Sequence, residues 1–312
     1  MTNSKAIEVK VKPVTTIFTG DIYGKSKDVR LTGIIGSIRW WMEALVRGLG
    51  GFACDPTESN PKKTWKKCDF KLSKDVLKKT KSYKKTMKQS LEEVCPVCQF
   101  FGCGGLSSAV RWNIKEGQIR GDRDFTLQLI PTRKVTPELW WLFEKTLYII
   151  EKYGSIGGKT ADKPYDKSHY KNYGLVKFET DFSHKNSIKY DQVVRWLSGQ
   201  LNRTSEDSIS LPNLTKFWFV KGDFLMKNLI NKFLKLTRKG NTYEKKEERE
   251  FHEFLRGSRN GDSKKIFSFN KKGYERMWGY VRSSDNLPYD KLKNKKVKSG
   301  REIFGELKGD SK

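Results

Sequence analysis

The sequence predicts an α+β protein built from two ferredoxin-like (RRM-like) domains. Up to about residue 183, alternating apolar segments and helical apolar stripes follow the order strand, helix, two strands, helix, strand, with one interruption. This β-α-β-β-α-β order is that of the ferredoxin-like fold. With 312 residues and 36% apolar side chains, the chain is long enough for two cores. We therefore predict one domain over 1–183 and a second over 184–312.

The first predicted strand and helix lie on either side of a loop. The stretch "AIEVKVKPVTTIF" (6–18) alternates and is rich in β-branched residues, which predicts a strand. The helix that follows carries an apolar stripe through Ile38, Trp41 and Leu45, which predicts a face packed on the sheet.

The opening of that helix, "GIIGSIRWW" (33–41), also suggests a binding site. Its two glycines allow close backbone approach, and Ser37 is predicted to cap the first turn. Arg39 is predicted beside the helix terminus, which attracts anions. The segment is therefore a candidate phosphate site, and the alternative is a capped core helix.

Residues 52–105 interrupt the pattern and are predicted to be an insertion, with a lysine-rich helical run over 73–93. All five cysteines lie here, and "CPVC" (95–98) has the spacing of two thiolates that bind one tetrahedral zinc ion. The predicted cofactor is a structural zinc ion, and its predicted ligands are Cys54, Cys68, Cys95 and Cys98, with Cys103 as the spare thiol.

Two alternatives to the zinc site are a thioredoxin-type redox pair and scattered reduced thiols. The glycines at 102, 104 and 105 argue against the redox pair, because they stop the helix that such a pair needs.

The rest of the first domain follows the expected order. The stretches "AVRWNI" (109–114) and "FTLQLIPT" (125–132) predict a hairpin. A helix over 136–153 is predicted to begin with Thr136 as its cap and Pro137 in its first turn, and "LVKFETDF" (175–182) predicts the last strand.

The second domain has a weaker pattern. The predicted elements are a helix at 190–201, a strand in 214–222, one long helix over 223–256 and strands in 264–270 and 277–284. The last segment, 291–312, is predicted to be a basic tail that orders against a partner.

Charge points to a polyanionic partner. The chain has 63 Lys and Arg against 36 Asp and Glu, a net charge of +27. Nucleic acid fits better than a membrane, because no run of about twenty apolar residues is present. A lysine-rich proteome is the alternative explanation. The sequence shows no secretion signal, so the expected location is the cytoplasm, where cysteines stay reduced.

Two glycine-rich loops predict RNA contacts. The loop "FFGCGG" (100–105) precedes Arg111 on a strand, and "GSIGGKT" (154–160) is followed by alternating basic and aromatic residues. This combination is typical of single-strand binding. The second loop lacks the spacing of a Walker A motif, and tight turns are the alternative for both.

Catalytic groups are sparse. The three histidines, His169, His184 and His252, have no metal-like spacing. Asp21 and Asp28 lie in the loop before the first helix, where a carboxylate could assist RNA cleavage, although loop aspartates are usually turn formers. We therefore predict that the protein is not an enzyme.

Three motifs together carry a resemblance to a known family: "LTGIIGSIRWW", "CPVCQFFGCGG" and "IGGKT". In this combination the chain resembles the RAMP superfamily of CRISPR proteins, most closely the first-numbered subunits of the type III-B, or Cmr, effector complex. The likeness covers roughly residues 5–180. The third loop departs from the family pattern, because it has lysine where arginine is common and inserts about ten residues before Tyr173.

The resemblance implies a non-catalytic RNA-binding subunit that holds the 3′ region of a guide CRISPR RNA and helps target RNA dock, in antiviral defence. It also implies contacts with other Cmr subunits, especially the backbone RAMP subunits to which cleavage is ascribed. The alternative within the superfamily is a metal-independent endoribonuclease that processes CRISPR RNA. A zinc-dependent redox protein is a third hypothesis.

From the charge, the loops and the resemblance together, the predicted RNA-binding residues are Lys25, Arg30, Gly36, Arg39, Trp40, Gly104, Gly105, Arg111, Gly157, Gly158, Lys159, Lys163, Lys167 and His169.

Overall fold

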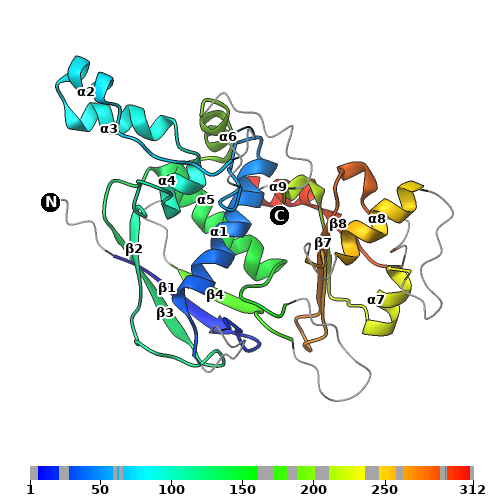
Figure 1. Ribbon diagram of the computed structural model, residues 1–312. Helices are drawn as coiled ribbons and strands as arrows, with labels where there is room; N and C mark the ends of the chain where they lie inside the picture. Colours follow the sequence, from blue (N-terminus) through cyan, green and yellow to red (C-terminus); the bar gives the residue numbers. More distant parts are fainter. Residues whose placement is uncertain are drawn as a thin grey trace.

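The computed structural model contains two four-stranded antiparallel sheets with helices packed against them (Figure 1). It describes residues 6–20, 28–58, 62, 66–160, 172–180, 188–200, 211–235, 246–257, 263–288, 292 and 294–309. The predicted α+β class with two ferredoxin-like units is confirmed. None of the described helices is long and apolar enough to cross a membrane.

The first sheet has the strand order β2-β3-β1-β4, the ferredoxin-like arrangement that the sequence predicts. Helices α1 and α5 pack on one of its faces (Figure 1). The bounds of these elements are β1 Ile7–Pro13, α1 Leu31–Gly48, β2 Val110–Ile114, β3 Phe125–Pro131, α5 Pro137–Lys152 and β4 Val176–Thr180.

Local sequence explains these elements. In β1, Ile7, Val9 and Val11 are buried and alternate with exposed residues, so one face of the strand joins the core. Helix α5 begins as predicted, because the Thr136 hydroxyl accepts a hydrogen bond from the Leu139 amide at 3.4 Å.

In the part of the insertion that the structure describes, three short helices form, α2 Lys74–Thr80, α3 Tyr83–Glu92 and α4 Pro96–Phe101. Helix α4 ends at Gly102, whose φ of +87° a residue with a side chain rarely adopts. The glycines therefore stop the helix after "CPVCQFF", as expected.

The second sheet repeats the order of the first as β6-β7-β5-β8. Helix α6 precedes it, α7 and α8 cover one face, and α9 follows the last strand (Figure 1). The bounds are α6 Tyr190–Ser198, η1 Leu214–Lys216, β5 Phe217–Lys221, α7 Lys227–Phe233, α8 Lys246–Arg256, β6 Ile266–Phe269, β7 Arg276–Tyr280, η2 Ser284–Asn286, β8 Val297–Ser299 and α9 Gly300–Lys308.

The prediction of one long helix over 223–256 is wrong. Residues 223–226 are not helical, and α7 ends at Phe233. The physical reason lies in β6, where the Ser268 hydroxyl accepts from the Leu225 amide at 2.9 Å and donates to the Leu225 carbonyl at 2.8 Å. These bonds hold the start of the segment in an extended conformation.

The prediction that 291–312 is a basic tail that orders against a partner is also wrong, because β8 completes the second sheet and α9 packs back on the core of the same chain. The Ser299 hydroxyl and Glu302 form a capping box at the start of α9. Ile303 and Leu307 are buried. Lys296, Lys298, Arg301 and Lys308 are exposed, so the segment is basic in sequence although its end forms a short amphipathic helix.

The two domains share one apolar core. It runs from the first sheet through α1 to the inner face of the second sheet, where Phe217, Phe219 and Trp278 lie. A separate cluster that includes Trp218 and Leu255 covers the other face of that sheet. Both faces of the second sheet are therefore buried.

Candidate functional site: a groove between the domains and a cysteine cluster

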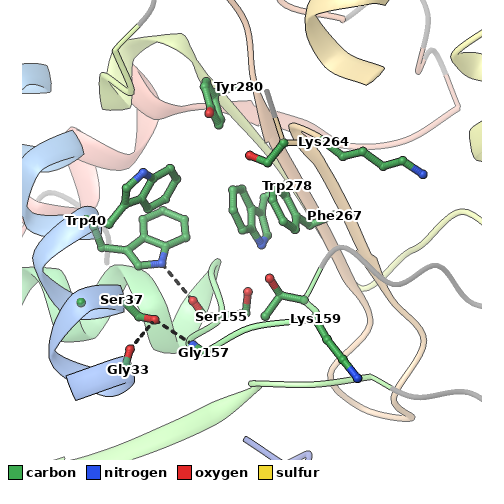
Figure 2. Close-up of a pocket in the computed structure, with 14 residues that line it drawn as sticks. Gly33, Ser37, Trp40, Ser155, Gly157, Lys159, Lys264, Phe267, Trp278 and Tyr280 are labelled. Carbon is green, nitrogen blue, oxygen red and sulfur yellow. Dashed lines mark hydrogen bonds between the residues drawn. The ribbon is translucent and has the colours of Figure 1, made fainter. Parts of the chain in front are cut away.

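An open groove with a cavity volume of about 480 Å³ lies where the two domains meet (Figure 2). Its walls come from the first half of α1, from the glycine loop after α5, and from β6 and β7 of the second domain. The lining residues are Gly33, Gly36, Ser37, Trp40, Trp41, Ser155, Gly157, Lys159, Thr160, Ser263, Lys264, Phe267, Trp278 and Tyr280.

Helix α1 presents a small-residue face to the groove. A Cβ atom at Gly36 would meet nothing within 4 Å, so this glycine leaves open space. The helix begins at Leu31 with Arg30 as its N-cap residue, so the predicted cap at Ser37 is wrong. The Ser37 hydroxyl instead donates to the Gly33 carbonyl at 3.0 Å and accepts from the Gly157 amide at 2.8 Å. Ser37 therefore ties the helix to the glycine loop.

The glycine loop is held close to the first domain. Gly157 has a φ of +79°, and a Cβ there would lie 2.5 Å from the Phe18 carbonyl oxygen. The Gly158 amide donates to that same oxygen at 2.6 Å. The amides of both glycines thus have hydrogen-bond partners within the protein. The positive charge of the loop comes from Lys159, whose Nζ lies 4.1 Å from the Phe18 ring centroid.

The opposite wall is aromatic. Phe267 on β6 and Trp278 on β7 are cross-strand partners, stacked with centroids 3.7 Å apart and an interplanar angle of 12°. Trp40 reaches this wall from α1, with its centroid 6.0 Å from that of Tyr280. Sequence analysis missed Phe267, Trp278, Tyr280 and Lys264. The signal that could have found the three rings is the aromatic residues at alternate positions of the two strands.

The four predicted zinc ligands lie together. The sulfur atoms of Cys54, Cys68, Cys95 and Cys98 are all within 4.8 Å of one another, and all four residues are buried. Cys54 Sγ lies 3.4 Å from Cys98 Sγ and 3.8 Å from Cys95 Sγ. Sulfurs around one tetrahedral zinc ion, with Zn–S bonds of about 2.3 Å, lie roughly 3.8 Å apart. The cluster could therefore hold a metal ion, and no disulfide joins these residues.

Two arginines of α1, the half-buried Arg39 and the buried Arg47, support the cluster. Arg39 donates to Cys98 Sγ at 3.1 Å, to Glu43 Oε1 at 3.0 Å and to the Gly102 carbonyl at 3.0 Å. Arg47 donates to the Cys54 carbonyl at 2.8 Å. Burial lowers the pKa of Arg39, but Cys98 and Glu43 outweigh it and leave that pKa above the ordinary value. Both cations stabilise negative charge on the sulfurs.

The other predicted RNA-binding residues are dispersed. Arg39 faces the cysteine cluster, while Arg30 and Arg111 are exposed outside the groove. Gly104 and Gly105 pack the insertion: the Gly104 carbonyl accepts from the Phe70 amide at 2.7 Å, and a Cβ at Gly105 would lie 2.3 Å from the Phe70 oxygen. RNA contacts of these residues stay predictions, whereas Gly36, Trp40, Gly157 and Lys159 line the groove and Gly158 adjoins it.

Several predicted residues lie outside the described part of the chain, namely Lys25, Lys163, Lys167, His169, His184 and Asp21. Of the remaining candidates for catalysis, His252 is buried in the second domain. The Asp28 carboxylate accepts a hydrogen bond from Gln118 at 2.6 Å.

Fold and site together define a protein of two ferredoxin-like domains with a cysteine-bearing insertion and an interdomain groove. Residues 10–161 match the model of the RAMP superfamily, which confirms the resemblance over the first domain. No curated protein matches the chain.

Two solved structures are similar in outline. Cmr1 from Pyrococcus furiosus in its apo form is 12% identical, with 95% of this chain and 99% of that chain covered and a TM-score of 0.45. The Csm3-Csm4 subcomplex of a type III-A CRISPR-Cas interference complex contains a chain that is 14% identical, with coverages of 60% and 86% and a TM-score of 0.28.

Proposed function

We propose that this protein is a non-catalytic RNA-binding subunit of a type III CRISPR effector complex, of the Cmr kind, and that the interdomain groove holds single-stranded RNA. In this role it binds the 3′ region of the guide RNA, helps target RNA dock and contacts backbone RAMP subunits in the cytoplasm. The match of residues 10–161 to the RAMP superfamily model and the three motifs support the assignment.

The composition of the groove carries the proposal. Single-stranded RNA needs room for its backbone, rings on which bases stack, and cations for phosphates. The groove supplies a glycine face on α1, the aromatic wall of β6 and β7, and Lys159 and Lys264 at its edge. With a net charge of +27, the whole chain attracts a polyanion.

The open face of the first sheet is a weaker candidate. RRM-type domains stack bases on aromatic residues of this face. Here Glu8, Lys10 and Lys12 occupy the face on β1 and form ion pairs with Lys115, Asp124 and Glu179. These charges cancel locally, so the groove is the better RNA site.

The proposed metal is a structural zinc ion held by Cys54, Cys68, Cys95 and Cys98. Four thiolates are the donor set of structural zinc sites. Bound there, zinc would cross-link the segment around Cys54 to α4 and so hold the insertion against α1.

Fluorescence anisotropy with a labelled single-stranded RNA tests the proposal. We expect log K to fall linearly with log salt concentration, with a slope that measures the number of phosphates neutralised. Lys159→Gln and Lys264→Gln should each reduce the slope by about 0.7. Lys84→Gln, at an exposed residue of α3, is the matched control and should leave the slope nearly unchanged, because α3 lies far from β7 in Figure 1 and Lys84 is not among the residues that line the groove.

Two outcomes would overturn the proposal. Affinity that does not change with salt contradicts phosphate binding. A defined cut in labelled repeat RNA that Asp21→Asn or His169→Ala abolishes favours the endoribonuclease alternative over a non-catalytic role.

A further inference from the structure

Two buried polar atoms beside the groove have no hydrogen-bond partner among the described residues. They are Nε1 of Trp278 and Oγ of Ser155, whose residues are 3% and 4% exposed. In Figure 2 the indole nitrogen of Trp278 lies on the side of its ring that faces Ser155 and Lys159. A buried donor without a partner is costly, so a ligand that supplies an acceptor here is favoured.

The chemistry of these atoms restricts the ligand. An indole N–H only donates, and a serine hydroxyl both donates and accepts. The ligand therefore presents a hydrogen-bond acceptor to Trp278. The aromatic pair of Phe267 and Trp278 beside this donor favours a flat, π-bonded group.

The size and charge of the groove restrict the class of ligand further. A cavity of about 480 Å³ falls in the range of roughly 300–1,000 Å³ typical of sites that bury a small ligand. Lys159 and Lys264 are among the lining residues and supply positive charge for the phosphates of a bound strand.

We infer that the groove extracts one unpaired nucleobase from the RNA strand and binds its edge through Trp278 Nε1 and Ser155 Oγ. This inference rests on the proposed function, because it names the part of the RNA that the groove binds. The base packs against the aromatic wall while α1 leaves space at Gly36. Because Trp278 Nε1 and Ser155 Oγ bind the base itself, an abasic site at that position of the RNA removes both hydrogen bonds.

A matched pair of variants isolates the indole donor. Trp278→Phe keeps an aromatic ring and removes the N–H group. Trp218→Phe makes the same change on the opposite face of the same sheet, in a tryptophan whose Nε1 also has no partner among the described residues and which packs against α7 and α8. Any general effect of the substitution on the sheet is common to both variants.

The test combines these variants with a set of short RNAs in which a single abasic site is moved along the strand. One abasic position should weaken binding to the wild-type protein by about fivefold to tenfold. Trp278→Phe should weaken binding of the intact RNA by a similar factor, and the abasic penalty should then disappear. Trp218→Phe should retain the full penalty. Ser155→Ala should give a smaller loss in the same direction.

The outcomes separate this inference from the proposed function. If the abasic penalty is as large in Trp278→Phe as in the wild type, or if no abasic position matters, base insertion is wrong. Salt-dependent binding of the intact RNA would then still support the proposed function. If the wild-type protein does not bind single-stranded RNA, both are wrong.

Discussion

The two sheets have the same strand order but opposite surroundings. In β1, buried residues alternate with exposed ones, and the open face of the first sheet carries ion pairs. In β5 and β7 nine of the ten residues are buried, because one face packs on α7 and α8 and the other on α1. The aromatic residues on the inner face of the second sheet therefore have two roles. They pack in the core that the two domains share, and beside that core they line the groove.

Metal removal should have the largest effect on stability, and it acts on the first domain, which carries the four cysteines. We expect one zinc ion per chain, and Cys98→Ser should lower the free energy of unfolding by more than about 4 kcal/mol. Metal analysis and urea denaturation measure both quantities. Cys103→Ser, which lies outside the four-sulfur set, is the control and should keep the metal.

Hydrogen exchange sharpens this prediction. After metal loss, amides of α4 and of α1 should lose more protection than amides of the cluster around Trp218 and Leu255. Equal loss of protection in both sheets would show that the cysteine cluster does not act locally.

Truncation of Trp41 tests whether the domains share one core. Its ring contacts Phe217 and Trp278 at centroid distances of 5.6 and 4.9 Å, and its Nε1 donates to the Ser155 carbonyl at 2.9 Å. Trp41→Ala should cost about 3–5 kcal/mol of unfolding free energy, in a single transition for both domains. Tyr83→Ala, at a residue that is 62% exposed, should cost less than about 0.5 kcal/mol. Two separate transitions in the wild-type protein would contradict a shared core.

Filling the groove should weaken RNA binding without weakening the fold. Gly36→Leu adds a side chain in open space and should reduce RNA affinity about tenfold or more, which corresponds to at least about 1.4 kcal/mol. Gly305→Leu in α9 is the matched control, because a Cβ there also meets nothing within 4 Å. Both changes should raise the unfolding free energy by up to about 1 kcal/mol. An equal affinity for RNA in both variants would remove the groove from the binding site.

A pH effect at the contact between α5 and α9 should be the smallest. Burial raises the pKa of Glu306, but hydrogen bonds from Lys298, Tyr153 and Tyr148 outweigh it and hold the pKa below the ordinary value. This contribution to stability is present above the unfolded-state pKa of about 4.3 and is lost as the pH falls through the lower folded-state pKa.

Denaturation of Glu306→Gln and the wild type at neutral and acidic pH measures that contribution. The difference in unfolding free energy should be below about 1 kcal/mol at pH 7 and should shrink in acid. Glu8→Gln, on the open face of the first sheet, should change stability by less than about 0.5 kcal/mol at either pH. If the difference in unfolding free energy between the wild type and Glu306→Gln instead grew in acid, the predicted pH dependence would be wrong.

Sequence reasoning predicted the features that depend on local pattern. The first four strands, α1 and α5 follow from periodicity, and the four clustered cysteines follow from the spacing of "CPVC" and two further thiols. The groove depends on contacts between distant segments. Ser37 meets Gly157, 120 residues later, and the aromatic wall exists only because the second sheet packs on α1. Helix α9 was missed although the Ser299–Glu302 capping box marks its start.

Photocrosslinking tests the central claim most directly, that the groove and not the open face of the first sheet holds single-stranded RNA. The full chain is irradiated with an RNA that contains 5-iodouridine, and the adducts are located by mass spectrometry. We predict adducts on Trp40, Phe267 and Trp278. Adducts confined to β1 and β2, around Lys10 and Arg111, would contradict the account.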